Sequence, residues 1–183
     1  MFDCGIPFRK MKEDLYLVDT LLITHSHVDH VKASTFESIR KEFPLIKTYA
    51  NADVAYQYEV DKVIGTCPFE LSGNRTVIPF DGTHDVPVTG YVLQMRGVNI
   101  LYMTDTARVD LPYDIPLDYI FLESNFDERK LREQSKKYKR HGYDPYLSVT
   151  RHLSTQKCRE FYYLHRRDQG SLLIELHQSR RFY

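Results

Sequence analysis

Three histidines and an aspartate fall within six residues of this chain, in the segment His25, Ser26, His27, Val28, Asp29, His30. An apolar run, Leu21–Ile23, precedes the segment and predicts a strand. If the strand stays extended, His25 and His27 point to the same side and reach one ion. Imidazole with carboxylate favours Zn²⁺ and also suits Mn²⁺ or Fe²⁺. The segment therefore predicts a metal site.

The alternative for these four residues is a group of surface histidines, or of histidines satisfied inside the core, beside a turn aspartate. Histidine and aspartate are costly to bury without partners. Four of them on one loop therefore favour metal ligation over packing.

Further polar residues follow predicted strands at some distance along the chain. These residues are His84, Asp105 and Glu123, and His152 directly precedes a predicted helix. Loops at sheet edges are where a rigid scaffold usually carries chemistry. A single histidine or aspartate after a strand is more often a turn residue, but together they supply the ligands that a two-ion site still needs.

The apolar patterns predict alternating strands and helices. Strands are expected at residues 15–24, 45–49, 63–64, 76–80, 90–95, 98–103, 119–122 and 171–177, and helices at 35–43, 51–59, 127–140 and 154–167. Ser34–Glu37 has the sequence of a capping box, and Leu172, Ile174 and Leu176 are expected to face inward.

Length and composition fit one soluble globular domain over residues 1–183, with 42% hydrophobic residues. No apolar run is long enough to predict a membrane span, and the first residues lack the pattern of a signal peptide. A cytoplasmic protein is therefore expected. Three cysteines in unlike contexts predict reduced thiols.

The net charge is zero overall but unevenly distributed. Residues 128–183 hold 14 Lys and Arg against 6 Asp and Glu, so the first 127 residues carry the opposite excess. The basic residues Lys136, Lys137, Lys139 and Arg140, with tyrosines nearby, would suit the backbone and bases of a nucleic acid. The alternative is a solvated helix face neutralised by acidic residues of the same molecule.

The order of these motifs resembles that of the metallo-β-lactamase-fold hydrolases. The matching segments are Asp3-Cys4-Gly5, the histidine segment, His84, Thr104-Asp105-Thr106 and His152. Leu122–Asp127 and Arg151–Ser154 further resemble the exonuclease-like branch called WalJ or YycJ and its small phage-encoded relatives. The resemblance implies an α/β (α+β) fold, an αββα sandwich, and hydrolysis by two divalent ions.

The resemblance also implies a role for each matching residue. His25, His27 and His84 would hold the first ion, Asp29, His30 and His152 the second, and Asp105 would bridge them. Asp29 and Asp105 would be catalytic, and Asp3 would orient the ligands from behind. Glu123 and Asn125 would support the bridging aspartate or line the pocket, unless they are ordinary turn residues. His177 is a candidate substrate contact.

Asp3 stands at the start of the chain, whereas strands precede this aspartate in the family. We therefore expect the N-terminal strands to be missing or shortened. An exposed sheet edge would favour a homodimer.

Three functions fit these observations. The first is a phosphodiesterase or nuclease acting on DNA or RNA through water activated by the metal ions. The second keeps the site but changes the substrate to a cyclic nucleotide, a lactone or a thioester; a closed apolar pocket would favour it. The third is a truncated, non-catalytic metal-binding module.

Overall fold

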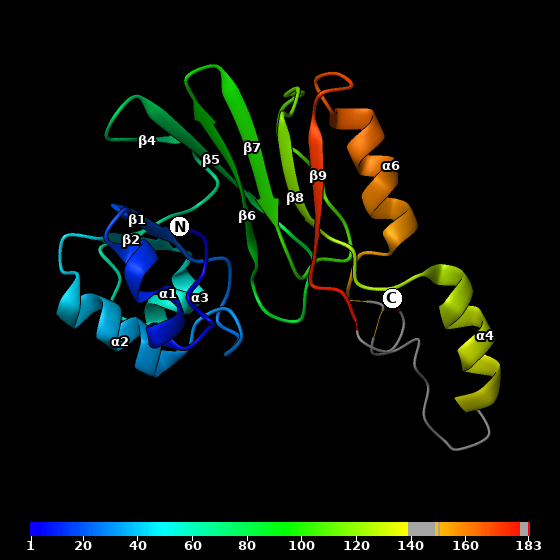
Figure 1. The fold of residues 1–183 in the computed structure, drawn as a ribbon, viewed down its shortest axis with the longest axis horizontal. Helices are drawn as coiled ribbons and strands as arrows, with labels where there is room; N and C mark the ends of the chain where they lie inside the picture. The colour runs from blue at the N-terminus through cyan, green and yellow to red at the C-terminus, as the bar shows by residue number, and fades with distance from the viewer. Residues whose placement is uncertain (139–148, 150, 180–182) are drawn as a thin grey trace. The chain divides into compact units, whose positions relative to one another are not determined.

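The computed structural model of the chain describes residues 1–138, 149, 151–179 and 183. These residues form two compact units, of which the first comprises residues 1–67 and 86–89. The second comprises residues 68–85 and 90–183. Both units combine helices with a sheet (Figure 1), which confirms the predicted α/β class.

The first unit is built on a three-stranded parallel sheet in the order β1-β2-β3. Its strands are β1 (Thr20–Leu22), β2 (Lys47–Ala50) and β3 (Lys62–Val63), and its helices are α1 (Phe8–Leu15), α2 (Ala33–Glu42) and α3 (Ala52–Gln57). Near the N-terminus, Phe2 forms a bridge to Leu22 and Cys4 one to Val31. The N-terminal residues are thus held to the first unit by isolated bridges and form no strand of the sheet.

The core of the first unit places the histidine segment at the carboxyl end of β1. Met11 and Leu15 of α1 and Phe36 and Ile39 of α2 are buried against the strand residues. Ligands of open parallel sheets bind outside the carboxyl ends of the strands. The apolar run before His25 therefore positions the segment at the edge where such sites form.

Two local predictions in the first unit are wrong. Leu15 ends helix α1, so the expected strand over 15–24 shrinks to Thr20–Leu22. The capping box also does not form, because α2 starts at Ala33 with Lys32 as its N-cap and without a side-chain cap. The Thr35 hydroxyl instead donates to the Ile6 carbonyl at 2.9 Å. This contact joins the first turn of α2 to the segment that precedes α1.

The second unit contains a six-stranded sheet in the order β4 to β9. Its strands are β4 (Phe69–Leu71), β5 (Arg75–Asp81), β6 (Thr89–Met95), β7 (Val98–Met103), β8 (Tyr119–Glu123) and β9 (Leu172–Leu176). The pairs β4/β5 and β6/β7 are antiparallel, whereas β7, β8 and β9 are parallel. The carboxyl ends of these three parallel strands meet at one edge.

The second unit contains the helices α4 (Glu128–Tyr138) and α6 (Thr155–His165). Helix α6 packs against β8 (Figure 1), with Cys158 and Phe161 buried. Ser154 caps α6, because its side chain accepts from the Lys157 amide.

The prediction for β9 is wrong at one end. Leu172, expected to face inward, is 54% exposed. Because β9 is the edge strand of the sheet, its first residue lacks a neighbouring strand on one side. Strict alternation of buried and exposed residues is therefore a weak guide here.

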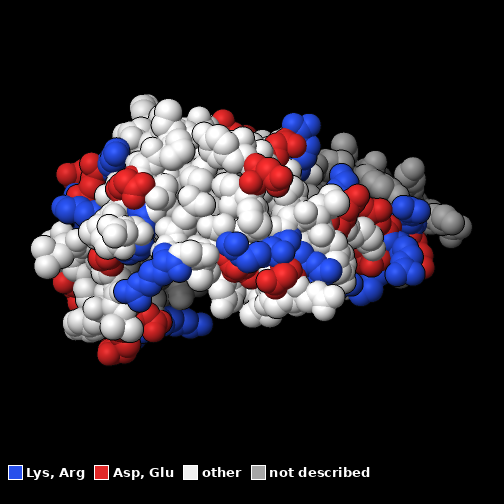
Figure 2. All heavy atoms as spheres, turned by 90° about the horizontal axis from the view of Figure 1, so that it is seen from above, with Lys and Arg blue, Asp and Glu red and all other residues white. Residues whose placement is uncertain are grey.

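Described arginines of the basic C-terminal part lie beside carboxylates of the same unit. Arg159 binds Glu175 at 2.8 Å, Arg167 binds Asp118 at 2.6 Å, and Arg151 pairs with Asp85. On the face that Figure 2 shows, basic and acidic side chains are intermixed. For these arginines the structure favours internal neutralisation over an open basic surface.

The three cysteines are free thiols, as predicted. Cys4 and Cys158 are buried and Cys67 is exposed. Burial is the main reason that the pKa of the Cys4 thiol and that of Cys158 are each raised to about 12. A buried thiol of this kind reacts slowly, because the thiolate is the nucleophile.

Alkylation by iodoacetamide at pH 8 is therefore expected to modify Cys67 and to leave Cys4 and Cys158 unmodified in the native protein. Peptide mass spectrometry measures this. Rapid labelling of Cys4 without loss of structure would contradict the burial of the N-terminal segment.

Among the described helices, none is both long and apolar enough to cross a membrane.

Candidate metal centre

The first unit brings two imidazole nitrogens to the separation that one ion requires. His25 Nε2 and His27 Nδ1 lie 3.2 Å apart. Two ligands of a tetrahedral ion with bonds of 2.0–2.1 Å lie about 3.3 Å apart. The extended backbone after β1 therefore places the two nitrogens at a separation that suits one ion.

Asp3 holds this arrangement from behind. Its Oδ1 accepts from the Thr24 amide at 2.8 Å, and its Oδ2 lies 2.9 Å from His30 Nδ1. The Thr24 hydroxyl in turn lies 3.0 Å from His25 Nδ1. Contacts of this kind fix the tautomer and orientation of ligating imidazoles. The backbone of Asp3 adopts a left-handed φ of 55°, a conformation that costs a non-glycine residue about 1 kcal/mol or more.

Asp29 and His30 lie on a turn that follows the extended pair. The amides of His30 and Val31 both donate to the His27 carbonyl, at 2.9 and 2.8 Å. The turn leaves the Asp29 side chain 62% exposed, with its Oδ2 3.8 Å from His30 Nε2. Asp29 and His30 thus form a second donor pair beside the first.

The second unit gathers two carboxylates and two histidines at the carboxyl ends of its parallel strands. Asp105 follows β7, Glu123 ends β8, His177 follows β9, and His152 precedes α6. One ligand atom from each of these four residues lies within 4.8 Å of those of the others. The parallel register, which pairs Glu123 with Leu176, explains why residues far apart in sequence meet.

Glu123 is the centre of this cluster. Its side chain is 0% exposed, and its Oε1 lies 2.6 Å from His152 Nδ1 and 3.0 Å from His177 Nδ1. Its Oε2 accepts from the amides of Thr106 at 2.7 Å and Leu153 at 3.1 Å. Glu123 thereby fixes both the imidazoles and the two loops that carry Asp105 and His152.

Asp105 lies closer to His177 than to His152. Asp105 Oδ1 is 2.8 Å from His177 Nδ1 and 3.4 Å from His152 Nδ1. Both Asp105 and His177 have left-handed backbones, with φ of 48° and 51°. Strain of this kind concentrates at functional sites.

The two carboxylates change the protonation of both histidines in the metal-free protein. Burial by itself lowers the pKa of His152, but interactions with Asp105 and Glu123 outweigh it and raise that pKa to about 9. Hydrogen bonds to Asp105 and Glu123 raise the pKa of His177 to about 10, against the opposing effect of burial. Both imidazoles are therefore protonated at neutral pH.

Because a metal binds the neutral imidazole, metal binding at this cluster must release protons. We expect the apparent affinity for Zn²⁺ to rise with pH between about 7 and 10 and then to level off. Isothermal titration calorimetry in buffers of different ionisation enthalpy measures the released protons. An affinity that does not change over this pH range would contradict the proton-competition argument.

His84 lies in the second unit with the cluster. Its Nε2 is 3.0 Å from Asp85 Oδ1, its Nδ1 is 3.3 Å from the Arg151 carbonyl, and its ring centroid is 5.3 Å from that of His152. The two loops that carry these histidines are therefore adjacent.

The remaining predicted site residues divide into two groups. Asn125 Nδ2 donates to the His177 carbonyl at 2.9 Å, so this residue supports His177 directly. Lys136 and Lys137 lie in the last turn of α4, whereas Lys139 and Arg140 lie outside the described residues.

Sequence reasoning gave His177 only a possible substrate contact, whereas the structure makes it a full member of the cluster. The available signal was its position at the end of a predicted strand, close to the feature that identified Asp105 and Glu123. Thr24 is not singled out by the sequence, and Thr106 enters only as part of a matching segment, because a threonine beside a ligand carries no distinctive pattern.

Comparison with known proteins identifies the class. Residues 2–142 match the family model described as the beta-lactamase superfamily domain. The chain therefore belongs to this superfamily, whose members are metal-dependent hydrolases and whose fold implies divalent metal binding. A comparison with curated protein sequences finds no match.

Solved structures share the fold at low sequence identity. A diphosphatase of the PhnP family is 18% identical with a TM-score of 0.70, covering 99% of this chain and 68% of that one. The metallo-beta-lactamase fold protein YhfI from Bacillus subtilis is 14% identical with a TM-score of 0.71, covering 98% and 73%. The short form of human tRNase Z is 18% identical with a TM-score of 0.66, covering 98% and 82%. These likenesses confirm the metallo-β-lactamase type of fold.

Proposed function

We propose that this chain is a dinuclear metal-dependent hydrolase of phosphodiester bonds in DNA or RNA, acting in the manner of the exonuclease-like branch of its superfamily. The observation that carries the proposal is the meeting of Asp105, Glu123, His152 and His177 at the ends of three parallel strands. The chain belongs to a superfamily of metal-dependent hydrolases, which supports a role for this cluster in metal binding and hydrolysis.

The proposed ligand set is the one that the resemblance to the family implies. His25, His27 and His84 would hold one ion, Asp29 and His30 the other, and Asp105 would bridge them. The nitrogen separation of 3.2 Å between His25 and His27 and the mixed nitrogen and oxygen donors fit Zn²⁺, with Mn²⁺ or Fe²⁺ as alternatives. Bound ions of this kind supply Lewis acidity, which activates water and stabilises charge on phosphate oxygens.

The last ligand of the second ion comes from His152 or His177. The resemblance to the family assigned it to His152. The shorter distance from His177 to Asp105 favours His177, while His152 is held by Glu123 at 2.6 Å. A protonated imidazole held by a buried carboxylate is suited to donate a proton to the leaving oxygen. We therefore propose His177 as the ligand and His152 as the proton donor.

The variants His152→Ala and His177→Ala separate these roles. We expect His177→Ala to lose one ion per chain. His152→Ala should keep both ions but hydrolyse substrates with poor leaving groups more slowly. A p-nitrophenyl phosphodiester, whose p-nitrophenolate leaving group needs no proton, should be hydrolysed well by His152→Ala. The reverse pattern would return the ligand role to His152.

The phosphodiesterase proposal is tested with purified protein on single-stranded DNA, duplex DNA, RNA and cyclic nucleotides, with and without a chelator. Hydrolysis that is abolished by the chelator and by His25→Ala, but retained in the surface control Lys41→Ala, would support it. Absence of hydrolysis of every phosphodiester by the metal-loaded protein would contradict it and favour the non-catalytic module.

A small substrate is the second candidate, because a mostly apolar pocket lies beside the cluster of the second unit. Hydrolysis of cyclic nucleotides, but not of polynucleotides, in the same panel would select this alternative.

A further inference from the structure

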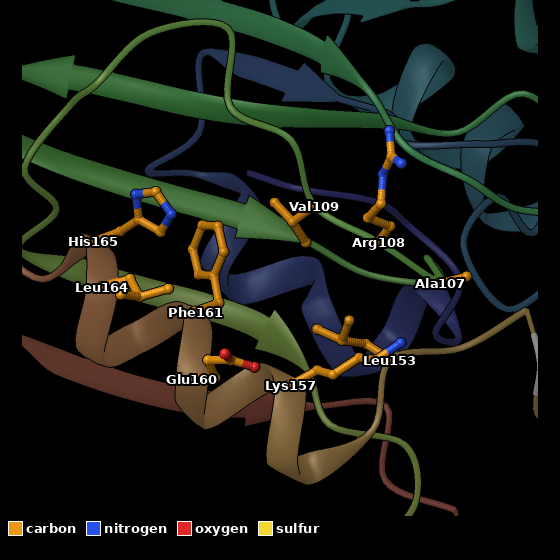
Figure 3. A pocket seen from close by; sticks show the side chains of 9 residues that line it. All are labelled: Ala107, Arg108, Val109, Leu153, Lys157, Glu160, Phe161, Leu164 and His165. Atoms are coloured by element: carbon orange, nitrogen blue, oxygen red, sulfur yellow. The ribbon is translucent and has the colours of Figure 1, made fainter.

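A pocket of about 400 Å³ lies between the Ala107–Val109 segment and helix α6 in the second unit. Its apolar walls are Val109 on one side and Leu153, Phe161 and Leu164 on the other (Figure 3). A volume of this size falls in the range of sites for small molecules and cofactors.

The pocket shares its supports with the histidine and carboxylate cluster. Ala107 lies two residues after Asp105, and Leu153 directly follows His152. The Oε2 atom of Glu123 accepts from the amides of Thr106 and Leu153, so one buried carboxylate fixes both walls of the pocket at this end. One end of the pocket is therefore next to the cluster.

The two ends of the pocket differ in chemistry. Lys157, in the first turn of α6, lines the end next to Leu153, and the described residues offer its ammonium group neither a hydrogen bond nor an ion pair. At the other end the rings of Phe161 and His165 stack, with centroids 4.3 Å apart and planes inclined by 32°. Figure 3 shows both rings rising from α6 toward Val109.

The remaining charged side chains limit the kinds of ligand that fit. Arg108 pairs with Asp110, and its guanidinium is turned away from α6 (Figure 3). Among the described residues that line the pocket, Lys157 therefore offers a cation at the end next to Leu153. Glu160 adds a carboxylate that accepts hydrogen bonds, such as those from an exocyclic amine.

We propose that this pocket binds one nucleotide unit, with the base between Val109 and the Phe161–His165 pair and the phosphate at Lys157. Apolar walls with a stacked ring pair suit a flat aromatic group, and base stacking on aromatic side chains is a strong, sequence-tolerant interaction. The cation and the N-terminal end of α6 suit an anion at the other end. An aliphatic ligand would leave both polar ends unused.

This inference rests on the proposed function and narrows its substrate. The phosphate end of the pocket is the end next to His152, so the bound nucleotide is one attached to the reacting phosphate. A base held in this pocket is neither paired nor stacked on its neighbours. Single strands, chain ends and small nucleotides are therefore preferred over continuous duplex.

Binding of AMP to the metal-free protein, followed by amide chemical shifts in the presence of a chelator, tests the pocket without using hydrolysis. We expect AMP to shift the amides of Ala107, Leu153 and Leu164, and to bind at least tenfold more tightly than inorganic phosphate or adenosine. Lys157→Ala should weaken AMP binding about tenfold, since a hydrogen bond to a charged group is lost.

Leu164→Glu, which places a carboxylate in the wall, should weaken AMP binding by a similar factor. Both substitutions are at exposed positions, and circular dichroism checks that the fold is kept. Lys41→Ala, at an exposed lysine of the first unit, is the matched control and should bind AMP as the wild type does.

Two results would overturn the proposal: no AMP binding at millimolar concentration, or AMP binding that neither pocket variant weakens. If the wild type hydrolyses phosphodiesters while either result is obtained, the pocket assignment alone fails. If AMP binds as expected but no phosphodiester is hydrolysed, the pocket assignment stands and the proposed function fails.

Discussion

Replacing Glu123 by alanine is expected to lower the free energy of unfolding by about 3–5 kcal/mol, the usual cost of removing one partner from a buried ionic cluster. The carboxylate is fully buried and lies against two imidazoles whose pKa values it raises. Its loss also leaves the amides of Thr106 and Leu153 without their acceptor. Urea denaturation with a chelator present measures the effect without any contribution from metal binding.

Two control variants separate the effect of the buried carboxylate from that of removing any glutamate. Glu123→Gln keeps an oxygen acceptor for the two amides but removes the charge, so it should recover much of the stability while lowering the pKa of His152 and His177. Glu133→Ala removes an exposed glutamate of α4 and should change stability by less than about 0.5 kcal/mol. A Glu123→Ala protein as stable as the wild type would contradict the role of this carboxylate.

Replacing Gly5 by alanine is expected to lower the free energy of unfolding by about 3 kcal/mol, at the upper end of the range for overpacking. A Cβ atom at this position would lie 1.6 Å from the Asp29 carbonyl oxygen and 2.1 Å from its carbon. The obstacle is backbone, which cannot rotate away as a flexible side chain does. Either the Asp3–Gly5 segment or the Asp29–His30 turn must move.

The displacement caused by Gly5→Ala should also weaken metal binding. It would break the 2.7 Å hydrogen bond from the Cys4 amide to the His30 carbonyl and the contact of Asp3 with His30. Gly65→Ala is the matched control in the same unit, since a Cβ there meets nothing within 4 Å. Equal stability and equal zinc affinity in the two variants would refute this account of the turn.

The donor pairs of the first unit could be predicted because they are local. His25 and His27 follow an apolar run, and the period of an extended chain is enough to place them on one side. The contact between Asp3 and His30 was not derivable from local pattern, because it joins segments 27 residues apart. Only the resemblance to a family suggested a supporting role for Asp3.

The cluster of the second unit shows where local reasoning stops. Asp105, Glu123 and His177 each follow or end a strand, which the sequence indicates. Their meeting depends on β8 lying between β7 and β9, a parallel pairing of distant segments that no local pattern specifies. For that reason the sequence does not predict that His177 joins the cluster or that Asn125 contacts it.

The missed helix α1 has a different cause. Met11 and Leu15 are buried at a spacing of four residues, the period of a helix face, but Leu15 also begins the apolar run that leads into β1. A short apolar stretch fits both a helix and a strand. Packing of Met11 and Leu15 into the core of the first unit decided the outcome.

The number of metal ions per chain is the most direct test of the central claim that the proposed ligands hold a pair of ions. Inductively coupled plasma mass spectrometry of zinc-loaded, gel-filtered protein should give two ions for the wild type. The double variant His25→Ala/His27→Ala should keep one ion, and Asp105→Ala should bind both weakly. Two ions retained in the double variant, or none bound by the wild type, would contradict the account.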